Sequence, residues 1–299
     1  MKKVAAINDL SGIGKCSLTA AIPVLSALGV QTCPVPTAIL TSQTGFDGFY
    51  IDDCTNKIDE YIKHWNNLNL RFDGIYTGFL ANAEQVGKIY NFLNTFKNND
   101  TLLLIDPVMG DNGSIYPTFT HDLCDKLKTL SKEADIITPN LTEACIIADI
   151  DYNKFISSYT KDNDPKYLNK VHELGLKIIK NSSRSCTVII TGINYKSAGD
   201  EAEYIYNCAI TSDNIYFSKS KFSGLGYSGT GDIFASIICG YLVQNRPLES
   251  AILKAAEFIE IAAADAYSNK IDRNYGINFE KYLYMLTNNF NTKDLLNEK

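Results

Sequence analysis

The stretch Gly224-Leu225-Gly226-Tyr227-Ser228-Gly229-Thr230-Gly231-Asp232 stands directly before an apolar run, Ile233 to Val243, that is typical of a buried helix. Its glycines let the backbone turn tightly and approach a ligand closely, because no Cβ is in the way. The helix start leaves N–H groups without partners and carries a partial positive charge, which favours phosphate. Asp232 adds a carboxylate. The stretch therefore predicts a site suited to transfer of a phosphoryl group to a hydroxyl.

Two other interpretations of this stretch are open. An Asp in the first turn of a helix is also an ordinary capping feature. The run from Gly224 to Gly229 fits G-x-G-x-x-G, a dinucleotide fingerprint that should open a strand–helix–strand unit. A second helical segment, beginning near Pro247, follows instead, so the dinucleotide interpretation is the weaker one.

The composition of the chain bounds its class. The 299 residues are 45% apolar and 21% charged, as in an ordinary globular protein. A net charge of −6 and the lack of a basic cluster argue against a nucleic-acid partner. No apolar run reaches the roughly 18–20 residues that span a bilayer, and Asn8-Asp9 interrupts the N-terminal apolar run too early for a signal peptide. We expect a cytoplasmic protein with no membrane partner.

Apolar strand patterns alternate with helical patterns along most of the chain. This alternation predicts an α/β fold with a mostly parallel central sheet and helices on both faces. The expected strands are residues 3–7, 73–77, 101–105, 134–138 and 186–190. A later pair, 203–210 and 214–219, reads as a hairpin at a sheet edge. We expect one domain over residues 1–299, with Phe279 to Asn288 as the last helix.

Polar residues follow several of these strands, where α/β sheets bind ligands. Asp9 precedes a glycine-containing loop that ends in Gly14-Lys15, but Asp9 and Cys16 both break the phosphate-loop pattern. Asp106 and Asp111 follow a buried strand and could hold magnesium. Asn140 and Glu143 have the spacing of a helix capping box, which is a structural alternative to any role in binding.

In this order and spacing, the motifs resemble the ribokinase-like superfamily and, within it, the pyridoxal kinase family. The most specific motif is Gly229-Thr230-Gly231-Asp232 at a helix start; the others are Asp106-Pro-Val-Met-Gly-Asp111, Thr138-Pro-Asn-Leu-Thr-Glu143 and Thr191-Gly192. The resemblance covers nearly the whole chain. It implies a ribokinase-like three-layer sandwich that phosphorylates the 5′-hydroxymethyl group of pyridoxal, pyridoxamine or pyridoxine with ATP, in vitamin B6 salvage.

The resemblance also implies roles for single residues. It makes Asp232 the catalytic base and assigns the anion hole to Gly229, Thr230 and Gly231. It implies nucleotide contacts for Asp106, Thr138, Asn140, Thr191 and Gly192, and magnesium binding at Asp106, Asp111 and Glu143. It places Asp9, Gln43, Thr44 and Phe79 around the substrate ring. ATP, Mg2+, a monovalent cation such as K+ and a homodimer are implied as well.

Three residues leave the substrate open. Asp9 stands where many pyridoxal kinases have Ser, and the run Asp9 to Gly14 resembles hydroxymethylpyrimidine kinases. Phe79 replaces a frequent Tyr, whereas Asp232 favours pyridoxal kinase because many pyrimidine kinases have Cys there. A hydroxymethylpyrimidine kinase of thiamine synthesis, or an enzyme with both specificities, is thus the alternative. A silent nucleotide-binding regulator and a sugar kinase are less favoured. The helix start predicts a lowered pKa for Asp232.

Overall fold

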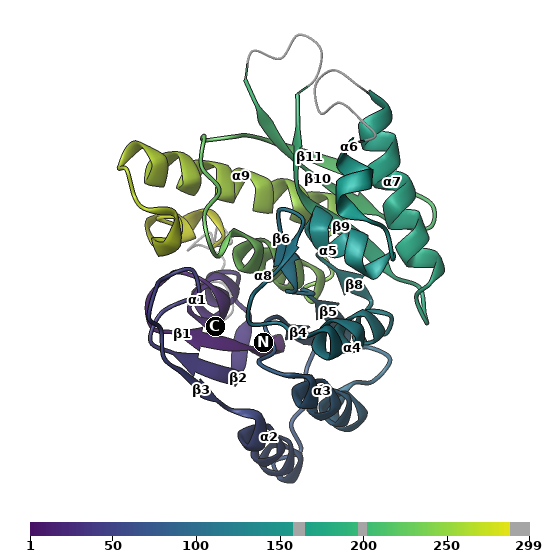
Figure 1. Cartoon of the computed structure of the whole chain (residues 1–299). Coiled ribbons are helices and arrows are strands. Elements are labelled where there is room, and N and C mark those ends of the chain that lie inside the picture. The colour runs from purple at the N-terminus through teal and green to yellow at the C-terminus, as the bar shows by residue number, and fades with distance from the viewer. Residues whose placement is uncertain (158–164, 197–201, 288–299) are drawn as a thin grey trace, which may run out of the picture.

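The computed structural model describes residues 1–157, 165–196 and 202–287 and is built around a nine-stranded sheet (Figure 1). The strand order is β11-β10-β9-β8-β5-β4-β1-β2-β3. The strands are β1 Lys3–Ser11, β2 Gln31–Leu40, β3 Ile51–Asp53, β4 Gly74–Thr77, β5 Leu102–Ile105, β8 Ile136–Ile137, β9 Thr187–Tyr195, β10 Tyr204–Ile210 and β11 Ile215–Lys221.

The sheet is parallel in its centre and antiparallel at both ends. The pairs β2–β1, β1–β4, β4–β5, β5–β8 and β8–β9 are parallel. The pairs β9–β10, β10–β11 and β2–β3 are antiparallel. The mostly parallel sheet and the late hairpin at its edge are therefore both confirmed.

Helices cover both faces of the sheet, so the expected three-layer arrangement is confirmed (Figure 1). On one face lie α1 Ser17–Ala27, α8 Thr230–Leu242 and α9 Leu248–Ser268. On the other face lie α2 Thr55–Asn67, α3 Ala83–Phe96, α4 His121–Ser131, α5 Leu141–Ile147, α6 Tyr152–Ser157 and α7 Pro165–Lys180. Each face has its own apolar core, because a sheet with two covered faces buries both.

The continuous apolar strands are explained by these two cores. Side chains of successive residues in a strand point to opposite faces of the sheet. In β1, Val4 and Ala6 belong to the core under α1, α8 and α9, while Ala5 and Ile7 belong to the other core, and all four are fully buried. A strand placed between two cores therefore needs an apolar residue at nearly every position.

The C-terminal region departs from the sequence prediction. Instead of a helix from Phe279 to Asn288, the chain forms two short 3-10 turns, η1 Arg273–Tyr275 and η2 Glu280–Met285; residue 288 lies outside the described residues. The segment is anchored by buried Ile277, Phe279 and Leu286. Phe279 and Leu286 are the caps of η2, so the buried residues flank the short turn rather than lying inside a helix.

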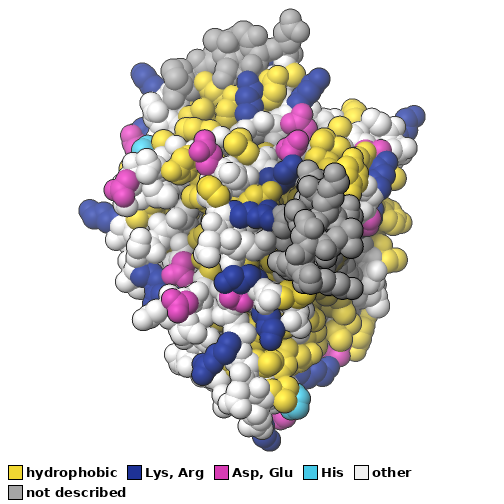
Figure 2. Space-filling model, turned by 180° about the vertical axis from the view of Figure 1, so that it is seen from behind, with side chains coloured by type: hydrophobic (Ala, Val, Ile, Leu, Met, Phe, Trp, Pro, Cys, Tyr) yellow, Lys and Arg dark blue, Asp and Glu magenta, His cyan; other side chains and the backbone are white. Residues whose placement is uncertain are grey.

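The surface agrees with the absence of a basic cluster in the sequence. Figure 2 shows Lys and Arg interspersed with Asp and Glu on the face opposite to that in Figure 1. Across residues 1–157, 165–196 and 202–287, every helix is too short or too polar to cross a membrane.

Candidate active site

Most of the site residues expected from the sequence lie along one edge of the sheet. The carboxyl ends of parallel strands meet at a common edge, where α/β proteins bind ligands. Five adjacent strands contribute one expected residue each to this edge. They are Thr191 from β9, Thr138 after β8, Asp106 after β5, Phe79 after β4 and Asp9 from β1. The residues expected at the nucleotide therefore lie at the β9 side and those expected at the substrate at the β1 side.

The start of α8 depends on Gly229. This residue is the N-cap of the helix and has a φ of 81°, a left-handed conformation that side chains with a Cβ rarely adopt. A Cβ here would lie 3.0 Å from Cys16 Cα and still closer to the Lys15 carbonyl oxygen. Because a glycine cap has no side chain, the first-turn N–H groups of Thr230, Gly231 and Asp232 receive no side-chain cap. They are the donors that the sequence predicted for an anion site.

The Asp232 carboxylate is held from β1 and from the start of α1. Asn8 Nδ2 donates to Asp232 Oδ1 at 3.0 Å, and the Ser17 backbone amide also faces the carboxylate. The side chain is only partly buried, but this partial removal from water raises the pKa of Asp232 to about 6, and the charge of Asp9 adds to that rise. The expectation of a lowered pKa was wrong: desolvation between the sheet and two helices outweighs the helix N-terminus.

Asp106 lies opposite the first turn of α8. A Cβ added to Gly231 would stand 3.9 Å from Asp106 Oδ2. Asp106 is 7% exposed, and burial raises its pKa well above the usual range, with further contributions from the charges of Glu143 and Asp232. A buried acidic group between two other carboxylates is stabilised by any cation that arrives with a nucleotide.

Glu143 performs the structural role that its spacing predicted. Glu143 Oε2 accepts from the Asn140 backbone N–H at 2.8 Å, and Asn140 Oδ1 accepts from the Glu143 N–H at 3.0 Å, which completes a capping box on α5. Glu143 Oε1 accepts from the Met109 N–H at 3.0 Å. Burial raises the pKa of Glu143 to about 8 against the lowering effect of these amides.

Asp111 lies on a short hairpin beside this capping box. The hairpin joins β6 Gly110–Asp111 to β7 Ser114–Ile115 through Asn112 and Gly113, whose φ values are 50° and 80°. Asn140 Nδ2 donates to the Gly110 carbonyl at 2.8 Å and fixes the hairpin to α5. Both Asp111 oxygens accept hydrogen bonds from Asn112. In the part of the chain that the structure describes, no three acidic, His or Cys side chains form a metal cluster.

The side of the site where the sequence predicts the nucleotide is built from β9 and the loop before α5. The Thr191 N–H donates to the Pro139 carbonyl at 2.9 Å, and Asn140 pairs with Thr191 in an isolated bridge. The next residue, Gly192, has a φ of 69°, and no heavy atom lies within 4 Å of the place a Cβ would take. The space beside the Gly192 backbone leaves room for a flat ligand next to β9.

The substrate side is built from β1 and the segment after β4. Asp9 is 5% exposed; burial raises its pKa, while hydrogen bonds from Ser17 and Ser11 lower it. Ser11 Oγ donates to Asp9 Oδ2 at 2.8 Å. The Phe79 ring packs edge-on against Phe119, with 5.8 Å between centroids. An aromatic wall near a buried carboxyl suits a flat ring with N–H groups.

Gln43 and Thr44 lie on the loop after β2, and the Gln43 side chain makes hydrogen bonds within the protein. Gln43 Nε2 donates to the Asn274 carbonyl at 3.1 Å and lies 3.4 Å from Ser228 Oγ. Thr44 is exposed. Lys15 donates to Glu280 Oε2 at 2.9 Å, so this lysine is engaged at the C-terminal turns.

Comparison with known proteins identifies the family. The phosphomethylpyrimidine kinase family model matches residues 14–277, which is most of the chain. The chain belongs to the phosphomethylpyrimidine kinase family. The resemblance stated from the sequence is thus confirmed at the level of this group of kinases.

The proteins that are similar to this kinase carry two kinds of name. A proposed phosphomethylpyrimidine kinase of Bacteroides thetaiotaomicron, crystallised with pyridoxal, is 34% identical, with 95% of each chain covered and a TM-score of 0.84. A pyridoxal kinase of Dictyostelium discoideum is 23% identical over 81% of this chain and 79% of its own. A hydroxymethylpyrimidine/phosphomethylpyrimidine kinase of Staphylococcus aureus is 28% identical over 74% of this chain and 78% of its own.

The structure of the kinase adds residues that sequence reasoning missed. Asn8 and Ser17 face Asp232, and fully buried Tyr76 lies close enough to lower the pKa of that carboxyl. The sequence carried one signal for Asn8, an amide placed inside an apolar strand directly before Asp9. No local pattern connects Ser17 or Tyr76 to Asp232, because the contact joins segments far apart in the chain.

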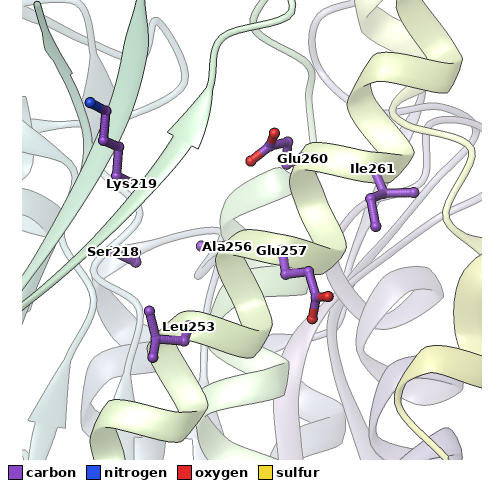
Figure 3. A pocket seen from close by; sticks show the side chains of 7 residues that line it. All are labelled: Ser218, Lys219, Leu253, Ala256, Glu257, Glu260 and Ile261. Atoms are coloured by element: carbon purple, nitrogen blue, oxygen red, sulfur yellow. The ribbon is translucent and has the colours of Figure 1, made fainter.

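A hollow of about 360 Å3 lies elsewhere in the kinase, between β11 and α9 (Figure 3). Its lining residues are Ser218, Lys219, Leu253, Ala256, Glu257, Glu260 and Ile261. None of them is a residue of the candidate active site.

Proposed function

We propose that the protein phosphorylates the 5′-hydroxymethyl group of a B6 vitamer with ATP. The observation that carries the proposal is the Asp232 carboxylate in the first turn of α8, beside unbonded first-turn amides and opposite Asp106. Phosphoryl transfer to a hydroxyl needs both parts, a group that takes the proton and donors that hold the charge on the moving phosphoryl group.

The reaction assigns one task to each part of the site. The hydroxymethyl oxygen attacks the γ-phosphorus, a new O–P bond forms, and the bond to the β-phosphate oxygen breaks. Asp232 orients the hydroxyl and accepts its proton. The N–H groups of Thr230 and Gly231 stabilise the negative charge on the transferred oxygens. A pKa of about 6 leaves Asp232 largely ionised at neutral pH and more basic than an ordinary aspartate.

Magnesium fits this site through the nucleotide rather than through a cage of protein ligands. Mg2+ usually takes one or two carboxylates together with phosphate oxygens and water. Asp106 is the carboxylate that would hold it, with Glu143 acting through water because both Glu143 oxygens already accept backbone N–H groups. When bound, the ion would neutralise phosphate charge.

The choice of a B6 vitamer rests on one relative and on Asp232. The Bacteroides protein with 34% identity was crystallised with pyridoxal, and Asp232 stands where many pyrimidine kinases have Cys. A hydroxymethylpyrimidine is the second candidate, because the family model carries a pyrimidine kinase name and the Asp9 loop resembles such enzymes. Both substrates are flat rings with a hydroxymethyl group. The carboxylate of Asp9 can accept a hydrogen bond from the protonated ring nitrogen of a B6 vitamer or from the amino group of the pyrimidine.

The test is ATP turnover with pyridoxal, pyridoxamine, pyridoxine and hydroxymethylpyrimidine in parallel. We expect the highest kcat/KM with one of the three B6 vitamers. A higher kcat/KM with the pyrimidine would overturn the B6 assignment and favour the second candidate. Phosphate transfer to none of the four would overturn both.

A further inference from the structure

Asn8 lies at the point where the substrate side of the site meets Asp232. The residue is fully buried near the end of β1. Its Oδ1 accepts the backbone N–H of Phe79 at 2.8 Å and that of Asp9 at 3.0 Å, and its Nδ2 donates to Asp232 Oδ1 at 3.0 Å. One side chain thus contacts both segments that face the substrate ring and the carboxylate that faces the hydroxyl.

The orientation of the Asn8 amide is determined by its partners. Both backbone groups are donors, so the side-chain atom that faces them must be the oxygen. The nitrogen must then face Asp232, where an ionised carboxylate is the matching acceptor. Gly78 contributes to this fit, because a Cβ at that position would overlap the Asn8 amide. These contacts fix the orientation of the Asn8 side-chain amide.

We propose that Asn8 is a positioning residue for phosphoryl transfer, which locks the Asp232 carboxylate toward the substrate hydroxyl and ties its place to Phe79 and Asp9. The inference rests on the function proposed above. It gives Asn8 no contact with the reacting atoms. Its effect comes through the position and the protonation of Asp232, where small displacements are costly for rate.

The ionisable groups around Asp232 define what a change at Asn8 does. Asp9 comes from β1, Tyr76 from β4, Asp106 from the end of β5, Tyr116 from the segment after β7 and Cys16 from the start of α1. None of these five carries a positive charge. The ionised form of Asp232 is favoured instead by the Asn8 and Ser17 amides, the Tyr76 hydroxyl and the N-terminus of α8.

The test variant is Asn8→Asp. It keeps an oxygen for the N–H groups of Phe79 and Asp9 but turns a carboxylate toward Asp232, so the backbone contacts survive while the donor is lost. We expect kcat to fall by about a hundredfold with the KM for ATP changed less than about threefold. We also expect the acidic limb of the kcat profile to move up by about one to two pH units. The introduced carboxylate raises the pKa of Asp232 directly, so the shift of that limb reports the contact, and the fall in kcat at a pH above the limb reports the loss of positioning.

Asn82→Asp is the matched control. Asn82 also accepts two backbone N–H groups, those of Glu84 and Gln85, and donates to a carboxylate, Asp53 Oδ2 at 2.7 Å. It is not part of the site. We expect its kcat and its acidic limb to stay as in the wild type.

A second measurement separates this inference from the proposed function. The Asp232 carboxyl is titrated by NMR in protein with 13C-labelled aspartate, with the resonance assigned by its loss in Asp232→Asn. An upward shift of one pH unit or more in Asn8→Asp supports the contact even if none of the four acceptors is phosphorylated. An unchanged titration overturns it, and so does a wild-type kcat in Asn8→Asp when the wild type is active.

Discussion

The substitution Asp232→Asn should make the protein more stable while it abolishes turnover. Burial raises the pKa of Asp232 from 3.8 to about 6. Because the folded state binds the proton more tightly, this group stabilises the fold below pH 4 and the stability is lost as pH rises through 6. A shift of about 2 pKa units amounts to about 3 kcal/mol of unfavourable free energy at pH 8.

The uncharged side chain of Asn at position 232 avoids this ionisation penalty and recovers most of this free energy. The neutral amide oxygen of Asn at position 232 accepts the hydrogen bonds from Asn8 and Ser17 less strongly than a carboxylate does, which costs about 1 kcal/mol. The net gain is therefore about 2 kcal/mol at pH 8. Near pH 4.5 the ionisation penalty is only about 1 kcal/mol, so the gain falls to about zero.

Urea unfolding at pH 8 and pH 4.5 measures this difference. The exposed carboxylate of Asp213, in the β10–β11 turn, supplies the control: Asp213→Asn should change the free energy of unfolding by less than about 0.5 kcal/mol. In the same preparations we expect Asp232→Asn to lower kcat by about 10²–10⁴-fold with ATP still bound. A variant less stable than the wild type at both pH values would refute the reasoning that desolvation dominates at Asp232.

Four further outcomes are expected. Gly229→Ala should destabilise the fold by about 3 kcal/mol, because αL strain adds to overlap with the Lys15 carbonyl, and thermal unfolding measures it. Glu143→Ala leaves two buried amides without acceptors and should raise the magnesium requirement; an unmoved Mg2+ titration makes Glu143 a cap only. Lys15→Met should leave the KM for ATP within about twofold, since Lys15 contacts Glu280. The kcat of the wild type should fall as pH drops through about 6, where Asp232 takes up its proton.

Local patterns were enough to predict the sheet and its helices. Strands buried on both faces are apolar at nearly every position, and β1, β5 and β9 stand out in the sequence for that reason. The 3-10 turns η1 and η2 were not predictable in this way. Their form depends on how Ile277, Phe279 and Leu286 reach a core made by distant segments.

The glycine run and its order relative to the strand-end motifs predicted the place of the candidate site. Glycine, proline and acidic residues act locally, through backbone conformation and helix ends, so their structural effect can be predicted from the sequence. The capping box of Asn140 and Glu143 is an example, because both of its hydrogen bonds span three residues.

Only the tertiary structure decided the electrostatics of the site. The sequence places Asp232 at a helix start and so predicts a lowered pKa, yet β1, β4 and α1 remove the carboxyl from water and raise it. The Asn8 contact joins residues 224 positions apart. Desolvation and such contacts depend on which segments fold over a group. They are set by three-dimensional packing and not by the residues next to that group in the sequence.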